Sequence, residues 1–221
     1  MSEKIRVDIP PSDHVTAIVY PPKGKRVPLR LILAHGAGSN QLTPSMTRMA
    51  TALSERGIET ITFNFLYSEK KKRVPDKNDK LEAVWRRIIE TFQEKNRALV
   101  IGGKSMGGRI ASQVAAARSS GIAGLVFLGY PLHPPGRPGQ LRSKHPSDIK
   151  APMLFVQGSK DAFGTPDELK PILKPLKNAE LCVVDNGDHS FKVPKSAGVP
   201  QDKIDAFVLD QVESWLKRKI A

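Results

Sequence analysis

The sequence predicts an α/β fold in which a mostly parallel central sheet carries helices on both faces. Short apolar segments rich in β-branched residues alternate along the chain with segments whose apolar residues recur at helical spacing. Polar or Gly-rich residues directly follow several of the apolar segments, as at the carboxyl edge of a parallel sheet. The chain has 221 residues, and we expect one domain over residues 1–221.

The composition is that of a soluble globular protein, with 39% hydrophobic and 26% charged residues. No apolar run approaches the roughly 20 residues that cross a bilayer. The N-terminus, MSEKIRVDIP, lacks the apolar segment of a signal peptide. Cys182 is the only cysteine, so no intrachain disulfide can form, and we expect a packed thiol in a strand. These features predict a cytoplasmic protein with no membrane partner.

The charge balance is strongly basic, with 35 Lys and Arg against 22 Asp and Glu and a net charge of +13. Such a surface attracts anions without specifying which. The chain contains no recognised nucleic-acid-binding signature and no basic stripe interleaved with aromatic residues. Nucleic acid is therefore not the expected partner, although binding of a polyanion stays an alternative. The oligomeric state is not predicted.

The N-terminal half is expected to open with an edge hairpin. Its strands cover residues 4–9 and 15–20, and a third strand over 29–34 leads into the Gly-rich turn 35–40. A helix over 43–56, a strand over 59–65, a polar loop over 66–78 and an amphipathic helix over 81–92 follow. The loop carries the run from Lys70 to Arg73, which is either a solvated segment or an anion-collecting rim beside a site.

The stretch LVIGGKSMGGR, from Leu99 to Arg109, is the most informative in the chain. We expect a buried strand ended by Gly102 and Gly103, and a helix that begins at Ser105 and covers residues 110–118. The motif G-x-S-x-G between them is typical of a sharp turn that exposes a nucleophilic serine. Glycine is needed on both sides because side chains would collide with neighbouring strands.

Two other interpretations of this stretch compete with the first. The letters GGKS resemble part of a phosphate-binding loop, G-x-x-x-x-G-K-S, but Ala98 stands where its first glycine is required. A Gly-rich turn with an idle serine is the other alternative.

The C-terminal half continues the alternation. We expect strands over 122–129, 152–157 and 180–184, a short helix within 166–175 and a closing helix over 203–219. Residues 130–150 form a proline-rich connection too short and irregular to build a large lid domain. His133 and His145 lie there, and we expect them to be polar loop residues.

Three candidate catalytic residues follow predicted strands, in the order Ser105, Asp161, His189. A serine hydroxyl needs a neighbouring base to act as a nucleophile. His189 would take its proton, and Asp161 would orient the imidazole and stabilise its charged form. Should Asp161 not serve, Asp185 and Asp188 are the next candidates.

Further residues are expected around this serine. The backbone N–H of Ala37, in the first Gly-rich turn, and that of Met106, which follows the serine, would stabilise an oxyanion. An ordinary tight turn would explain the glycines around Ala37 equally well. Lys104 and Tyr130 are expected to contact the substrate. No cofactor or metal is expected.

The motifs together resemble the dienelactone-hydrolase-like group of α/β hydrolases. They are AHGAGSN at 34–40, FNF at 63–65, GGKSMGGR at 102–109, GYPLHPPG at 129–136, FVQGSKDAFGT at 155–165 and DHSFK at 188–192. Within that group the chain is similar to the testis-expressed hydrolase-like proteins and the third subunit of the NSL chromatin complex. The resemblance implies the α/β-hydrolase fold, with Ser105 as nucleophile, Asp161 as acid and His189 as base.

These observations predict a cofactor-free serine hydrolase for small soluble esters or thioesters, with a basic surface that would favour anionic ones. Dienelactone hydrolases use a cysteine nucleophile, and the serine here favours esterase or thioesterase chemistry. The main alternative is a non-catalytic interaction scaffold, because some members of the group resemble partner-binding subunits.

Overall fold

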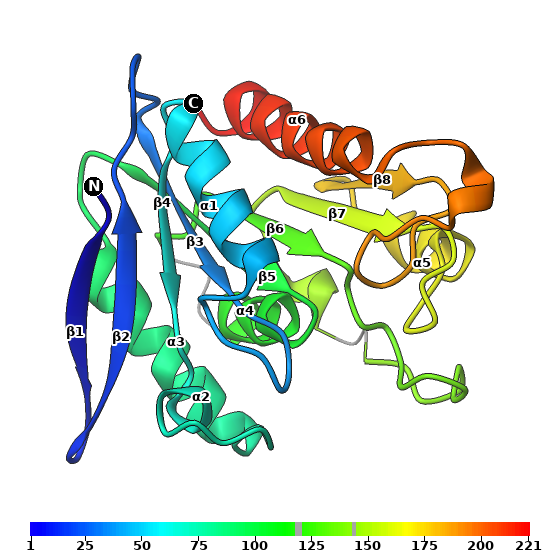
Figure 1. The fold of residues 1–221 in the computed structure, drawn as a ribbon. Coiled ribbons are helices and arrows are strands. Elements are labelled where there is room, and N and C mark those ends of the chain that lie inside the picture. The colour runs from blue at the N-terminus through cyan, green and yellow to red at the C-terminus, as the bar shows by residue number, and fades with distance from the viewer. Residues whose placement is uncertain (118–120, 143–144) are drawn as a thin grey trace.

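The computed structural model describes residues 1–117, 121–142 and 145–221. Its strands form one sheet in the order β1-β2-β4-β3-β5-β6-β7-β8 (Figure 1). β1 (Glu3–Ile9), β2 (Asp13–Tyr20) and β4 (Glu59–Phe63) pair antiparallel, which confirms the predicted edge hairpin. The other pairings are parallel, over β3 (Leu29–Ala34), β5 (Ala98–Lys104), β6 (Gly124–Leu128), β7 (Met153–Gly158) and β8 (Ala179–Val184).

Helices cover both faces of this sheet, as predicted (Figure 1). The helices α1 (Pro44–Glu55) and α6 (Gln201–Lys219) lie on one face, and α3 (Asn78–Phe92), α4 (Met106–Ala117) and α5 (Pro166–Leu173) lie on the other. Successive residues of β5 enter opposite cores, because side chains alternate along a strand. Val100 belongs to the core that contains Trp215 of α6, and Ile101 belongs to the core that contains Trp85 of α3.

The central strands are buried on both sides, which is why they read as continuous apolar runs rather than alternating ones. All six residues of β3 and of β7 are buried. Because β3, β5, β7 and β8 are parallel, the residues that follow them lie at one edge of the sheet. The Gly-rich turn, Ser105, Asp161 and His189 all follow these strands.

Several predicted boundaries are wrong. β5 does not end at the two glycines but continues to Lys104. Gly102 is needed within the strand because a Cβ there would overlap the backbone of Val126 on β6. β4 ends at Phe63 rather than at residue 65. Leu66 and Tyr67 are buried and form the short helix α2 (Leu66–Glu69) in the segment predicted to be a loop. α4 begins at Met106, and Arg118, its predicted last residue, lies outside the described residues.

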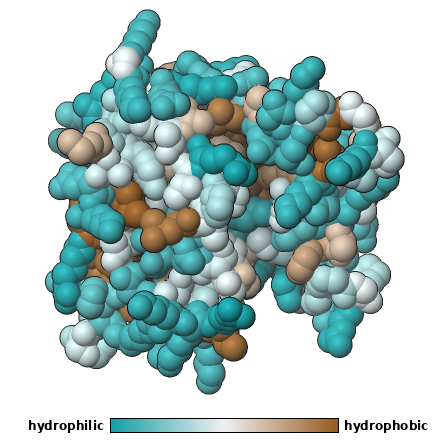
Figure 2. Space-filling model, viewed as in Figure 1, coloured by the Kyte–Doolittle hydropathy of each residue, from teal (hydrophilic) through white to brown (hydrophobic). Residues whose placement is uncertain are grey.

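The connection after β6 contains no lid in its described part. Apart from residues 143–144, it forms a proline-rich loop and one 3₁₀ turn (Pro146–Asp148), as its prolines predict. A second 3₁₀ turn (Lys195–Ala197) precedes α6. The face drawn in Figure 2 is mostly hydrophilic, with hydrophobic residues visible in small separate patches.

Candidate active site

Ser105 lies at the sharp turn between β5 and α4. Its backbone φ is +51°, a left-handed conformation that non-glycine residues seldom adopt. A Cβ at Gly103 would overlap the carbonyl oxygen of Ala34, and a Cβ at Gly107 would lie 2.6 Å from the carbonyl oxygen of His35. Both flanking glycines are therefore required by the approach of β3, as predicted.

This geometry also excludes the phosphate-loop interpretation. Residues Gly102, Gly103 and Lys104 belong to β5 and pair with β6. Their backbone N–H groups are therefore not arranged as an anion-binding loop. The Lys104 side chain turns away to the face covered by α1 and α6, where it lines a groove.

His189 connects Ser105 to Asp161. Its Nε2 lies 2.8 Å from Ser105 Oγ, and its Nδ1 lies 2.7 Å from Asp161 Oδ2. The His189 side chain is 19% exposed and that of Asp161 is fully buried. The ring of Phe163 stacks on the imidazole at a centroid distance of 4.2 Å. The structure thus brings together the three residues that the chain order singled out, with the imidazole accessible from solvent.

Asp161 is held by two further donors. Gln157 Nε2 donates to its Oδ2 at 2.8 Å, and the backbone N–H of Phe163 donates to its Oδ1 at 2.8 Å. Gln157 is fully buried, and its amide also bonds the backbone of Tyr130 and Gly164. Such bonds stabilise an ionised carboxylate in a buried position. Sequence reasoning missed Gln157, although a polar residue at the end of an apolar strand could have indicated it.

The predicted acid alternatives are placed elsewhere. Asp188 Oδ1 accepts hydrogen bonds from the backbone N–H groups of Ser190 and Lys192, so it shapes the loop that carries His189. Asp185 is exposed at the end of β8. Neither takes the place of Asp161 at the imidazole.

The turn after β3 lies directly against Ser105. A Cβ at Gly36 would be 3.5 Å from the Cβ of Ser105. The backbone N–H groups of Ala37 and Met106, the predicted oxyanion donors, form no hydrogen bond within the described parts of the chain. Both are thus available to an external acceptor.

His35 fixes the shape of this turn. Its Nε2 accepts from the backbone N–H of Phe65 at 3.3 Å, so its Nδ1 carries the proton and donates to the Gly36 carbonyl at 2.8 Å. The ring is fully buried, and burial lowers the pKa of His35 to about 4, which keeps it neutral. Tyr67 Oη donates to the same carbonyl at 3.2 Å. Both residues have positioning roles that the sequence analysis missed.

The two predicted substrate contacts lie in different surroundings. Tyr130 is 1% exposed, and its hydroxyl lies in the core near Ser112 and His145. Its side chain is therefore not at the site, which corrects the prediction. Lys104 is half-buried and donates through Nζ to the backbone carbonyl of His189. Burial lowers the pKa of Lys104 to about 8, and its Nζ lies 4.8 Å from the centre of the Phe191 ring.

A second serine–histidine pair connects α4 with the segment after β6. Ser112 Oγ is 2.6 Å from His145 Nε2 and donates to the carbonyl of Arg109 at 2.7 Å. Ser112 is fully buried within α4. Burial, aided by the Arg109 charge, lowers the pKa of His145 to about 4. The other predicted loop histidine, His133, is buried and pairs with Glu168 at 3.1 Å. Both histidines lie in the loop after β6, as predicted, and each contacts a side chain of a helix.

The basic segment lies beside the Gly-rich turn. Ser68 Oγ donates to the Ser39 carbonyl at 3.0 Å, and a Cβ at Gly38 would be 3.6 Å from the Arg73 carbonyl. An open groove of about 890 Å³ is lined by this turn together with Lys71, Lys72 and Arg73. Lys70 differs from them because it pairs with Asp13 at 2.6 Å. The segment therefore lies beside the turn with its four basic residues exposed, which leaves both predicted interpretations open.

The described residues hold no cluster of three or more His, Cys, Asp or Glu side chains suited to a metal ion. None of their helices combines the length and hydropathy that crossing a membrane requires. Cys182, at the edge of the sheet, packs against the α1–α6 core, and burial raises the pKa of its thiol to about 11.

Solved structures of several hydrolases share this fold. A lidless α/β serine hydrolase from Xanthomonas campestris is 21% identical, with a TM-score of 0.77 over 99% of this chain and 95% of that one. A dienelactone hydrolase from Anabaena variabilis is 18% identical, with a TM-score of 0.73 over 100% and 99% of the two chains. Est1E from Butyrivibrio proteoclasticus, solved with ferulic acid bound, is 16% identical, with a TM-score of 0.70 over 94% and 99%. At these identities the likeness establishes the fold.

The family follows from the sequence match. The model of the alpha/beta hydrolase domain matches residues 28–217, which include β3, the Gly-rich turn, the Ser105 turn, Asp161 and His189. The chain therefore belongs to the alpha/beta hydrolase family.

Proposed function

We propose that the protein is a serine hydrolase that cleaves carboxylic esters or thioesters through an acyl-Ser105 intermediate. One observation carries the proposal. Ser105 Oγ, His189 and the buried Asp161 form a continuous chain of hydrogen bonds of 2.8 and 2.7 Å, at a serine held in a left-handed turn. This arrangement supplies the base that a serine hydroxyl needs at neutral pH.

The residues imply a two-step reaction. Ser105 Oγ attacks the carbonyl carbon while its proton passes to His189 Nε2, and the oxyanion accepts from the N–H groups of Ala37 and Met106. Collapse of this intermediate breaks the bond to the leaving oxygen or sulfur, which takes the proton from His189. A water molecule then repeats the sequence on the acyl-enzyme, releasing the acid and restoring Ser105.

Ser112 and His145 are the competing pair, and their environment argues against nucleophilic chemistry. Ser112 is fully buried and its hydroxyl donates to the Arg109 carbonyl. The described hydrogen-bond partners of His145 Nε2 are two hydroxyls, those of Ser112 and Tyr130. A fully buried hydroxyl is not accessible to an ester.

Small soluble esters are the substrates that we propose. The described part of residues 130–150 provides no folded lid over Ser105, so interfacial activation is not expected. The Est1E structure with bound ferulic acid shows that a small aromatic acid can bind to a protein of this fold. The groove lined by Lys71, Lys72 and Arg73 favours substrates that carry an anionic group. The subfamily resemblance stays a prediction.

Labelling by a fluorophosphonate probe tests the proposal. The wild-type protein should be labelled, Ser105→Ala should not, and Ser112→Ala should be labelled like wild type. Circular dichroism of both variants checks that the fold is retained. Absence of labelling in the wild-type protein would favour the interaction scaffold instead, and a salt-dependent gel shift with nucleic acid would favour polyanion binding.

A further inference from the structure

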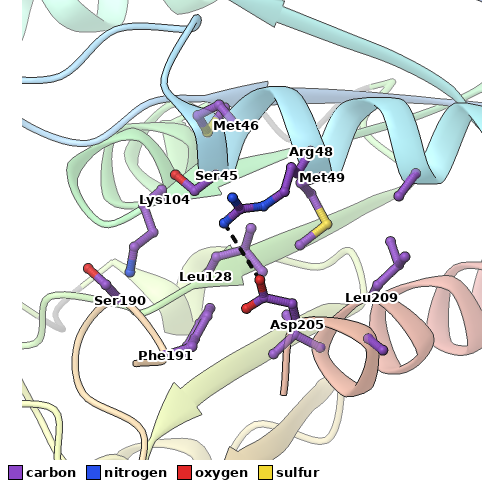
Figure 3. Close-up of a pocket in the computed structure, with 13 residues that line it drawn as sticks. Ser45, Met46, Arg48, Met49, Lys104, Leu128, Ser190, Phe191, Asp205 and Leu209 are labelled. Carbon is purple, nitrogen blue, oxygen red and sulfur yellow. Dashed lines mark ion pairs between the residues drawn. The ribbon is translucent and has the colours of Figure 1, made fainter. Parts of the chain in front are cut away.

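A groove opens between α1 and α6 next to the proposed site (Figure 3). Its cavity is about 250 Å³. The large side chains that line it are mostly apolar: Met46, Met49, Leu128, Phe191, Val208 and Leu209. An ion pair between Arg48 of α1 and Asp205 of α6, at 3.6 Å, crosses the groove (Figure 3).

The inner end of the groove is built from neighbours of the proposed catalytic residues. Lys104 precedes Ser105, and Ser190 and Phe191 follow His189; all three line the cavity. A Cβ at Gly129 would be 2.6 Å from Lys104 Nζ and 3.4 Å from His189 Nδ1. The Lys104 ammonium thus lies beside the imidazole, and the groove leads away from it between the helices.

The size and polarity of the groove indicate what it can hold. An apolar cavity of about 150 Å³ accommodates a benzene molecule, so this groove is large enough for a phenyl ring or a chain of about six carbons. The charge at the inner end belongs to Lys104, which is half-buried and already donates to the His189 carbonyl. The Arg48–Asp205 pair is largely exposed, so it does not oppose an apolar guest within the groove.

We propose that this groove binds an apolar leaving group of the ester, of about six carbon atoms; the inference rests on the proposed function. His189 Nε2 faces Ser105 and must deliver its proton to the leaving oxygen. The leaving group therefore lies against His189 in the reaction. Because Ser190 and Phe191 continue from His189 into the wall of the groove, a group placed there extends between α1 and α6.

Binding can be tested without turnover. The chain has five methionines, of which Met46 and Met49 line the groove. In Ser105→Ala protein labelled with ¹³C at the methionine methyls, hexyl acetate should shift the signals of Met46 and Met49. The signals of Met1 and Met153 should stay in place, and methyl acetate at equal concentration should shift none. Unchanged Met46 and Met49 signals with hexyl acetate would overturn the assignment.

Kinetics test the same groove in the active protein. The kcat/KM for hexyl acetate should exceed that for methyl acetate at least tenfold, since each methylene removed from water contributes about fourfold. Ala206→Trp, an exposed position of α6 that lines the groove, should reduce this ratio to about twofold or less. Thr51→Trp, exposed on α1 outside the groove, is the matched control and should keep both rates.

The outcomes separate this inference from the proposed function. Equal kcat/KM for hexyl and methyl acetate, or an unchanged ratio in Ala206→Trp, would overturn the groove assignment. A gain found only between methyl acetate and methyl hexanoate would place the acyl group there and would equally overturn it. If Ser105→Ala retained the wild-type rate, the proposed function would fail. The methionine signals would still decide whether the groove binds the hexyl group.

Discussion

The described residues include two serine–histidine pairs at similar distances in very different surroundings. Ser105 and His189 are 2.8 Å apart at the carboxyl edge of the sheet, on residues that follow β5 and β8. Ser112 and His145 are 2.6 Å apart beneath that edge, where α4 meets the connection after β6. The shorter contact belongs to the pair that a substrate cannot reach.

The difference shows that distance alone does not identify a nucleophile. Ser105 has a left-handed φ of +51°, and its histidine is oriented by Asp161. Ser112 lies in regular helix with its hydroxyl bonded to the preceding turn, a common arrangement for serine inside a helix. The first pair holds a strained, accessible conformation, whereas the second satisfies buried polar groups.

Substituting the two serines gives the largest expected contrast. Ser105→Ala should lower kcat for a p-nitrophenyl ester by about 10⁴-fold or more, because the nucleophile and its base act as a unit. Ser112→Ala should keep the rate within about twofold and instead lower the free energy of unfolding by about 1–3 kcal/mol, since His145 loses a buried partner. Initial rates and urea unfolding measure the two effects. Full turnover by Ser105→Ala, or its loss in Ser112→Ala alone, would exchange the roles of the pairs.

The carboxylate behind His189 is the next point of contrast. Asp161→Asn should lower kcat/KM by about 10³–10⁴-fold by favouring the wrong imidazole tautomer. Gln157→Glu is a second variant, which places a like charge beside Asp161 and should also lower the rate. Asp148→Asn, near His145, is the control and should leave the rate unchanged. If Asp161→Asn kept wild-type kcat/KM, the acid would have to be sought elsewhere.

The sequence predicted the first pair and not the second, for a physical reason. Ser105 is marked by glycines that only a close backbone approach requires, and Asp161 and His189 follow strands whose apolar runs are easily recognised. Ser112 and His145 carry no such local signal, because their contact depends on how the connection after β6 folds back onto α4. The roles of Gln157 and His35 were missed likewise, since each depends on hydrogen bonds between distant segments.

In the fold, too, features with a local sequence signal were predicted and features that depend on distant contacts were missed. Buried strands and amphipathic helices were found from their periodicity, whereas α2 was missed because the burial of Leu66 and Tyr67 depends on contacts with the rest of the fold. The side chain of Tyr130 was misplaced because a position at a strand end does not settle which way a side chain turns. Tertiary packing decided these cases.

The basic segment lies near the Ser105–His189 pair and not near the Ser112–His145 pair. Substitutions in it should therefore affect the reaction at Ser105. Lys71→Gln, Lys72→Gln and Arg73→Gln together should lower kcat/KM for a carboxylated ester by up to about tenfold at 0.01 M salt. The effect should shrink at 0.1 M, where the Debye length falls from about 30 to about 10 Å. Turnover of the neutral isostere should not change.

A matched control removes three charges elsewhere. Lys95→Gln, Lys174→Gln and Lys177→Gln alter exposed lysines outside this groove, so the net charge falls equally. If both triple variants lost the same fraction of activity, the overall charge rather than the groove would attract the substrate. Equal wild-type rates for the carboxylated and neutral esters at low salt would show that the segment is only part of the surface.

Substituting His145 should change the stability of the protein at acid pH and leave its activity unchanged, which is the smallest effect on activity that we expect. The folded pKa of His145 is lowered to about 4 by burial, below its reference value of about 6.5, so the unfolded chain binds the proton first. The stability that depends on neutral His145 is then complete above about pH 6.5 and is lost as the pH falls towards 4. The pKa of His35, lowered to about 4 by the same cause, adds to this loss in the same direction.

His145→Gln should therefore flatten the fall in unfolding free energy between pH 6.5 and 4.5 without removing it, whereas His14→Gln, at an exposed position, should follow wild type. The kcat/KM of all three proteins should be equal at each pH, because neither His145 nor His14 takes part in the proposed reaction. If wild type and His145→Gln lost stability equally as the pH falls, protonation of His145 would not contribute to the loss.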